Sequence, residues 1–212
     1  ESINVLISTR LGYSEEELAK APSGADMGLG CGNPQAIASL QPGEVVVDLG
    51  AGGGFDCFLA AHEVGETGQV IGIDMTPDML SKARANAVKG GFDNVEFRLG
   101  EIEHLPVADA SVDAIISNCV INLSQDKPQV FREMARILRP GGRVAISDVV
   151  RIRSFKGTRW EGDEHLSECI SGSIPPSELE AMMEEAGFID IRIVMNQSSE
   201  EFISEWDPDT GV

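Results

Sequence analysis

The chain has 212 residues, 42% of them hydrophobic, which is enough for one α/β domain with a buried core. Asp and Glu total 35 against 16 Lys and Arg, and the formal charge of −19 repels phosphate backbones, so nucleic acid is not expected as a partner. The sequence has no apolar run of about 18 residues, so no transmembrane helix is expected. Four dispersed cysteines are too few for a disulfide scaffold and predict free thiols in a reducing, cytoplasmic setting.

The N-terminal part is predicted to be a short helix followed by a loop. Ser14 and Glu17 have the spacing of a capping box, which predicts a helix that runs to about Lys20. Residues 21–33 are rich in glycine and form a predicted loop that carries Cys31. Because the first residue is Glu1 and not Met, we expect a fragment or a processed product.

From residue 45 onward, strand and helix patterns alternate. Strands are predicted at 45–49, 69–73, 95–99, 112–117 and 143–150, and helices at 55–64, 77–88 and 128–138. This alternation predicts an α/β fold with a doubly wound, Rossmann-like, mostly parallel sheet and helices on both faces.

Beyond residue 150 the alternation stops. Residues 151–174 are expected to form a polar loop that carries Cys169, followed by a helix at 176–186 with Gly187 as its C-cap and a sixth strand at 189–195. We therefore divide the chain into an N-terminal helix and Cys-bearing loop (1–34), a core (35–150) and a C-terminal Cys-bearing insertion, helix and strand (151–212). Completion of the sheet by a closing strand is expected to be lost by truncation.

A glycine-rich turn (residues 50–54) follows the first predicted strand, at the sheet edge where doubly wound folds bind ligands. A dinucleotide fingerprint, Gly-x-Gly-x-x-Gly, would need glycine where Phe55 stands, so a nicotinamide-dependent enzyme is disfavoured. The pattern acid-x-Gly-x-Gly-x-Gly fits in full, with Asp48, Gly50, Gly52 and Gly54. It resembles motif I of class I S-adenosylmethionine (SAM) methyltransferases.

The resemblance implies a SAM site at the carboxyl ends of the first strands. Asp74 directly follows the second strand, where a carboxylate can accept both ribose hydroxyls. Met75 is expected to pack on the adenine, although core filling is nearly as good an interpretation. The expected cofactor-binding residues are Asp48, Gly50, Ala51, Gly52, Gly54, Asp74, Met75, Glu101, Ile102 and Asn118.

More specific motifs lie at residues 28–34 (Gly-Leu-Gly-Cys-Gly-Asn-Pro), 117–123 (Ser-Asn-Cys-Val-Ile-Asn-Leu) and 147–149 (Ser-Asp-Val). With them the chain resembles the arsenite methyltransferase family along nearly its whole length. The resemblance implies methyl transfer from SAM to trivalent arsenic, as arsenite or methylarsenite, held by Cys31, Cys119 and Cys169. It also implies a thiol reductant such as thioredoxin or glutathione. Many members have a further cysteine upstream of the one at position 31, which this chain lacks.

Thiol chemistry agrees with that implication, because soft thiolates prefer soft centres such as trivalent arsenic. Each cysteine also has a simpler interpretation as a small buried apolar residue, which we favour for Cys57 on the apolar helix 55–64. Two alternatives stay open: a SAM methyltransferase for another small molecule, such as a quinone precursor, and an arsenic-binding module without catalysis.

Overall fold

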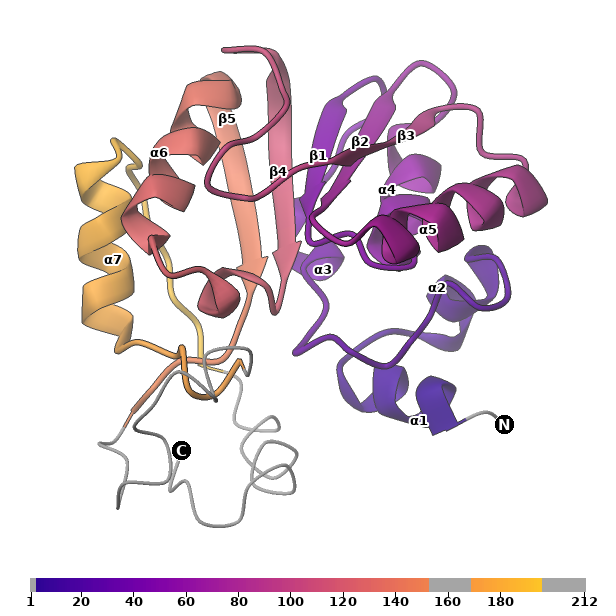
Figure 1. The fold of residues 1–212 in the computed structure, drawn as a ribbon, viewed down its shortest axis with the longest axis horizontal. Helices are drawn as coiled ribbons and strands as arrows, with labels where there is room; N and C mark the ends of the chain where they lie inside the picture. Colours follow the sequence, from indigo (N-terminus) through magenta and orange to yellow (C-terminus); the bar gives the residue numbers. More distant parts are fainter. Residues whose placement is uncertain (1–2, 153–168, 196–212) are drawn as a thin grey trace.

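The structure, a computed structural model, describes residues 3–152 and 169–195. Five parallel strands form one sheet in the order β3-β2-β1-β4-β5 (Figure 1). The strands are β1 (Val45–Leu49), β2 (Gln69–Asp74), β3 (Val95–Leu99), β4 (Val112–Asn118) and β5 (Leu138–Ser147). The chain runs outward from β1 to β3 and then returns to the other side of β1, so the order reverses beside β1. The predicted doubly wound fold is therefore confirmed.

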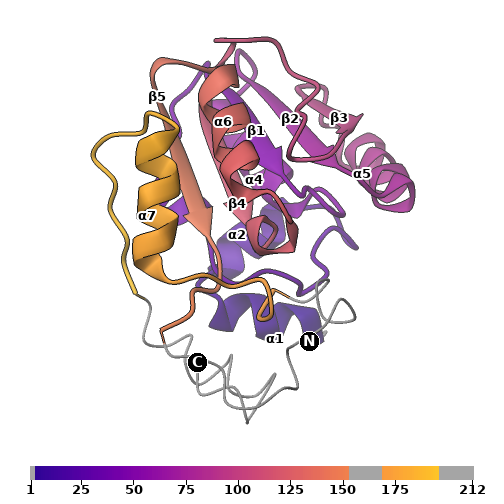
Figure 2. The ribbon, with the colours of Figure 1, turned by 60° about the vertical axis from the view of Figure 1, so that its left-hand side comes forward.

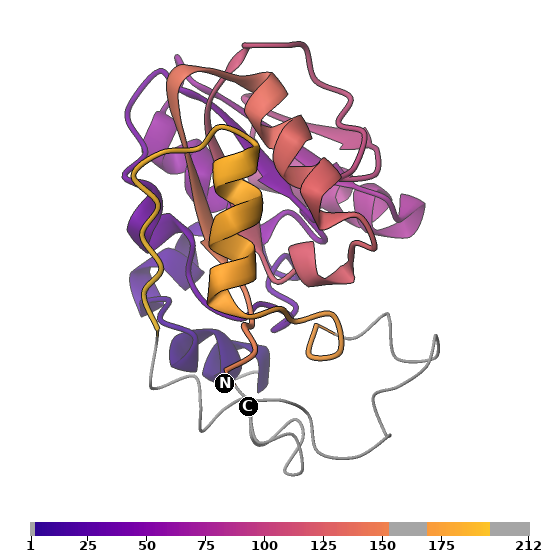
Figure 3. The same ribbon diagram turned by 90° about the vertical axis from the view of Figure 1, so that its left-hand side faces the viewer.

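Helices cover both faces of the sheet (Figures 1 and 2). Alternate residues of β1 pack into the two hydrophobic clusters on opposite faces of the sheet. Val46 packs with α4 (Phe55–Val64) and α5 (Pro77–Gly90). Val47 packs with α6 (Lys127–Ile137) and α7 (Pro176–Glu185). Burial on both faces is the reason that the strand residues form nearly continuous apolar runs. Figure 3 shows α7 and α6 in front of the sheet.

Most predicted boundaries are confirmed to within two residues. The largest shift concerns β5, which begins at Leu138, directly after α6, rather than at residue 143. Leu138 pairs with Val112, and a register irregularity follows between Val112 and Ala114. This irregularity takes up the segment Pro140-Gly141-Gly142.

The N-terminal segment lies beyond the carboxyl ends of the central strands, and α1 (Ile3–Arg10) sits below α2 in Figure 1. The predicted capping box of α2 (Glu15–Lys20) is confirmed: the Glu17 amide donates to Ser14 Oγ (3.2 Å), and the Ser14 amide donates to the Glu17 carboxylate (2.8 Å). The sequence analysis did not predict α1, α3 (Gln35–Ala38) or the short 3₁₀ helix η1 (Ile121–Leu123).

The predicted sixth strand at 189–195 is wrong, because residues 188–195 are described and contain no strand. Within the described residues β5 pairs only with β4, so this segment has no ladder partner, and Ile189 and Val194 are largely exposed. The C-cap of α7 is Ala186, and Gly187 follows it in the left-handed region. Part of the predicted insertion (153–168) and the C-terminal end (196–212) lie outside the described residues.

Within the described ranges, no helix combines the length and the apolar character that crossing a membrane requires.

Candidate functional site

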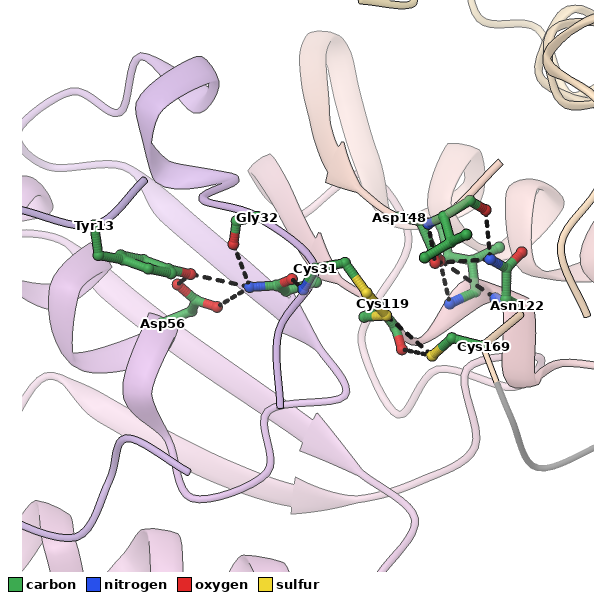
Figure 4. The surroundings of a disulfide bond; sticks show 11 residues. Tyr13, Cys31, Gly32, Asp56, Cys119, Asn122, Asp148 and Cys169 are labelled. Carbon is green, nitrogen blue, oxygen red and sulfur yellow. Dashed lines mark hydrogen bonds between the residues drawn. A yellow bond between two sulfur atoms is a disulfide. The ribbon is translucent and has the colours of Figure 1, made fainter. Parts of the chain in front are cut away.

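Three cysteines from distant parts of the chain meet at one point (Figure 4). Cys31 and Cys119 form a disulfide across 88 residues of sequence, and their Cα atoms are 5.5 Å apart. The thiol of Cys169 lies 3.0 Å from Cys119 Sγ and donates to the Cys119 carbonyl oxygen, also at 3.0 Å. We call these three residues the sulfur cluster.

The cluster corrects one expectation and supports another. Free thiols were predicted throughout, yet Cys31 and Cys119 are bonded, because the fold closes a distance that sequence spacing does not reveal. Cys57 is fully buried on α4, apart from the sulfur cluster, and donates to Asp48 Oδ2 (3.1 Å). Its interpretation as a buried packing residue is confirmed.

The backbone after β4 places Cys119. Its φ is +58°, a left-handed value that a non-glycine residue adopts only where the surroundings enforce it. The Cys119 amide donates to the Ser147 carbonyl at the end of β5 (2.8 Å), and η1 begins two residues later. The chain therefore turns sharply here and leaves the side chain at the carboxyl edge of the sheet.

Asp148 is a group that the sequence analysis did not assign, although it lies in the quoted Ser-Asp-Val motif. Its carboxylate accepts from the Ile121 amide (3.1 Å) and from the Asn122 side chain (2.8 Å), and so holds η1 beside the cysteines. A carboxylate oxygen of Asp148 and the three sulfurs all lie within 4.8 Å of one another. Burial raises the pKa of Asp148 to about 6. Burial, followed by the charge of Asp148, raises the pKa of Cys169 to about 12, so this thiol is protonated at neutral pH.

Asn118 connects the sulfur cluster to the N-terminal segment. Its Oδ1 accepts from the Cys31 amide (2.9 Å), and its Nδ2 lies within hydrogen-bonding distance of the Gly32 carbonyl (2.9 Å), Tyr13 Oη (2.9 Å) and Asp56 Oδ2 (3.1 Å). The Tyr13 hydroxyl donates to the other Asp56 oxygen (2.7 Å). Figure 4 shows Tyr13 and Asp56 on one side of the disulfide and Asp148 on the other. The Asn118 amide therefore holds the Cys31 loop, and its expected contact with the cofactor stays a prediction.

Burial governs the titration of this network. It raises the pKa of Asp56 to about 6 even though Tyr13 and Asn118 hydrogen-bond to the carboxylate. Burial and the neighbouring Asp56 charge raise the pKa of Tyr13 far above its ordinary value, so its hydroxyl stays a donor.

The glycine turn has the backbone that its sequence demands. Gly50, Gly52 and Gly54 have φ values of +73°, +51° and +90°. A Cβ at Gly54 would lie 2.8 Å from the rings of Phe58 and Phe97, so packing also requires glycine there. Asp74, at the end of β2, accepts from the Gly52 amide (2.9 Å) through one oxygen and from the Thr76 amide (2.8 Å) through the other.

The other residues expected to bind cofactor are distributed around this edge. Asp48 is buried, and burial followed by the charge of Asp56 raises its pKa. Met75 and Glu101 are exposed, with Met75 69% accessible, so Met75 is not a core filler. Ile102 is buried in the core on the α6 side of the sheet.

A cavity of about 100 Å³ lies between the glycine turn and the N-terminal segment. Gly50, Ala51, Gly52 and Gly53 line it together with Tyr13, Asp26, Asp48, Asp56 and Asn118. Its volume is below that of a whole nucleotide site and suits one end of such a ligand. Carboxylates on several sides favour a cationic group. Because Asn118 lines the cavity and directly precedes Cys119, the cavity and the sulfur cluster are adjacent.

The parallel sheet with its order reversal beside β1, the glycine turn after β1 and the acid after β2 define a class I SAM-methyltransferase type of fold. The model of a methyltransferase domain family matches residues 40–187, and the chain belongs to that family.

The chain is also similar to individual proteins of known name. An arsenite methyltransferase of Halobacterium salinarum is 56% identical over 202 residues, which are 95% of this chain and 52% of that protein. The human arsenite methyltransferase is 38% identical over 70% of this chain and 42% of its own length. A crystal structure of an arsenic(III) S-adenosylmethionine methyltransferase from Chlamydomonas reinhardtii superposes with a TM-score of 0.68 at 36% identity, covering 90% of this chain and 63% of that one. The resemblance found from the motifs is confirmed. The chain spans about half the length of the curated relatives it matches.

Proposed function

We propose that the protein transfers methyl groups from SAM to trivalent arsenic: arsenite bound by the thiolates of Cys31, Cys119 and Cys169, and methylarsenite, which has two hydroxyls to exchange, bound by two of these thiolates. The observation that carries this proposal is the meeting of three sulfurs from separate loops beside the cavity of the glycine turn. The similarity to proteins named arsenite methyltransferases supports the same substrate.

Arsenic binding requires the Cys31–Cys119 disulfide to open first. A dithiol or two molecules of a monothiol supply two electrons and two protons, and are themselves oxidised to a disulfide. We propose thioredoxin or glutathione for this role, in a cytoplasmic setting. Each of the three thiols then displaces one hydroxide from arsenite, and the thiol proton leaves with that hydroxide as water. Three sulfur ligands leave the arsenic lone pair free to attack.

The residues of the cofactor side fit SAM by their chemistry. Its sulfonium and ammonium groups are cationic, and Asp26, Asp48 and Asp56 all line the cavity. Asp74, Met75, Glu101 and Ile102 would hold the adenosine end, and the glycine turn would admit the ligand close to the backbone. When bound, SAM supplies an electrophilic methyl group on a positively charged sulfur.

The protein's contribution is to hold the arsenic in line with that methyl group. An arsenic–carbon bond forms with the lone pair of arsenic while the sulfur–methyl bond breaks, so arsenic is oxidised from trivalent to pentavalent. A further pair of thiols, itself oxidised to a disulfide, returns the arsenic to the trivalent state. Orienting two bound reactants in this way can lower a barrier by about 7–11 kcal/mol.

The proposal includes the division of the chain into residues 1–34, 35–150 and 151–212, since the first and last parts supply Cys31 and Cys169.

The test uses reduced protein, arsenite and SAM labelled in its methyl group, with product arsenic species separated by chromatography. Single Ser variants of Cys31, Cys119 and Cys169 are expected to lose at least tenfold in methylated product and to bind less arsenic. Cys57→Ala serves as the matched control, because this cysteine lies outside the cluster. Full methylation by Cys119→Ser would defeat the arsenic assignment. Bound arsenic without any methylated product would instead favour a binding module.

A further inference from the structure

Asp148 is a carboxylate at the sulfur cluster to which the proposed methyl transfer gives no role. It directly follows β5, and one of its oxygens lies within 4.8 Å of the sulfurs of Cys31, Cys119 and Cys169. Because these four atoms are mutually so close, an atom bonded to all three sulfurs would have a carboxylate within a few ångströms.

The protein holds this carboxylate in place through neutral donors. Its Oδ1 accepts from the Asn122 side chain (2.8 Å) and from the Val149 amide (2.8 Å). Its Oδ2 accepts from the backbone amides of Ile121 (3.1 Å) and Asn122 (3.3 Å). Four donors from two segments of the chain therefore fix the position of the charge beside the sulfurs.

No ion pair neutralises the charge of Asp148 within the part of the chain that the structure describes. Lys127 is a nearby cation, yet its ammonium group donates to the backbone carbonyls of Asn122 (3.3 Å) and Ser124 (2.9 Å). With a pKa of about 6, Asp148 is ionised at neutral pH. A fixed charge of this kind can stabilise an opposite charge that develops during a reaction.

Asp148 lies on the far side of the disulfide from the cavity of the glycine turn. Figure 4 shows Asp148 on one side of the disulfide and Tyr13 and Asp56 on the other. Tyr13 and Asp56 both line that cavity. A positive charge that passes from a ligand in the cavity to an atom held by the sulfurs therefore moves toward Asp148.

The proposed reaction moves a positive charge in this direction. Trivalent arsenic bonded to three thiolates is neutral, whereas the sulfonium of the methyl donor carries one positive charge. The arsenic lone pair forms the arsenic–carbon bond, and the electron pair of the broken sulfur–methyl bond stays on the donor sulfur, which becomes neutral. The positive charge then resides on the methylated, pentavalent arsenic.

We propose that Asp148 stabilises the positive charge that arises on arsenic during methyl transfer, and that it raises the rate of transfer more than the affinity for arsenite. This inference rests on the proposed function. An interaction that is stronger in the transition state than in the ground state lowers the barrier. Removing one preorganised group of this kind commonly lowers a rate by about 100- to 1,000-fold.

The first measurement is a single turnover by reduced protein that is saturated with arsenite and mixed with excess SAM. Asp148→Asn should lower the first-order rate of methyl transfer by about tenfold or more. The number of arsenic atoms bound per chain, counted by elemental mass spectrometry, should stay the same because the bound substrate is neutral. Asp93→Asn is the matched control, since it removes an exposed charge just before β3, and it should retain the rate.

The second measurement is calorimetry on the reduced full chain without arsenite, and it involves no turnover. Sinefungin carries an ammonium group where the donor has its sulfonium methyl, whereas S-adenosylhomocysteine is neutral at this place. At an effective dielectric constant of about 20, a carboxylate about 8–15 Å away favours a unit positive charge roughly 5- to 30-fold. Asp148→Asn should therefore weaken sinefungin by about this factor and S-adenosylhomocysteine by less than about twofold.

Asn122→Ala separates the charge of Asp148 from its structural contacts, because it removes the side-chain donor to Oδ1 and keeps the carboxylate. This variant should preserve the ratio of the two affinities. An unchanged ratio in Asp148→Asn would overturn the inference, as would a parallel loss of bound arsenic and of rate, which indicates that Asp148 only shapes the cluster. If the unmodified protein binds both probes and arsenite but forms no methylated arsenic, the proposed function fails and the inference fails with it.

Discussion

Replacing Asn118 by Ala tests how the Cys31 loop is held. The amide accepts one hydrogen bond from the Cys31 backbone and offers two hydrogens to three acceptors, namely Gly32, Tyr13 and Asp56. Alanine removes all of these bonds without adding bulk. The loop that carries Cys31 would then lose two of its ties to the end of β4.

The magnitude follows from those two ties. A neutral hydrogen bond contributes about 0.5–1.5 kcal/mol, so the bonds to Cys31 and Gly32 together hold the loop by about 1–3 kcal/mol. At about 1.4 kcal/mol for each factor of ten, this lowers the effective concentration of the Cys31 thiol toward Cys119 roughly 5- to 150-fold. The global free energy of unfolding falls as well, because the bond to the Asp56 carboxylate is lost.

The assay equilibrates the protein in glutathione redox buffers and counts the Cys31–Cys119 disulfide by alkylation and mass spectrometry. A Cys169→Ser background prevents disulfide formation with the third cysteine of the cluster. Asn94→Ala is the control, since the Asn94 side chain donates to the Ala61 and Gly65 carbonyls, away from the sulfur cluster. This control should lose stability and leave the disulfide equilibrium unchanged. The reasoning fails if Asn118→Ala shifts that equilibrium by less than twofold.

Gly54→Ala should lower the unfolding free energy by about 3 kcal/mol or more in urea titrations, because the new Cβ would lie 2.8 Å from two buried rings. Gly91→Ala is the control: Gly91 also has a positive φ, but a Cβ there would have no atom within 4 Å, so the loss should be only about 1 kcal/mol. Similar losses in the two variants would contradict the packing argument. Asp56→Asn should reduce the decline in stability between about pH 4 and 6, because a folded pKa raised to about 6 means that ionising Asp56 destabilises the protein by up to about 3 kcal/mol across that window. Asp148, whose pKa burial also raises to about 6, keeps its own share of the decline, so a variant whose stability falls as steeply as that of the unmodified protein would refute the assignment. Cys57→Ala should lower stability by about 1–3 kcal/mol and leave the number of arsenic atoms bound per chain unchanged, as counted by elemental mass spectrometry; a lower count would place Cys57 in the substrate site.

The local sequence determined the sheet and its glycine turn. Apolar runs such as residues 45–49 can be buried only as central strands, and glycines at 50, 52 and 54 are required by positive φ and close packing. The strand pattern and the positive-φ glycines depend on residues close in the chain, so the doubly wound, mostly parallel sheet and the place of the cofactor edge could be predicted, whereas the strand order was not. The cysteine types and their motifs likewise identified the candidates Cys31, Cys119 and Cys169.

Only the tertiary structure decided which side chains each of these residues contacts. The disulfide between Cys31 and Cys119, the approach of Asp148 to the three sulfurs and the Asn118–Tyr13 contact join positions that are tens of residues apart. The absence of a strand at the described residues 189–195 depends equally on which partners the fold supplies. Periodicity reports which face a side chain takes, but hydrogen bonds and sulfur contacts require atoms within a few ångströms. The packing of the N-terminal segment, Asp148 and Cys169 around the end of β4 sets those distances.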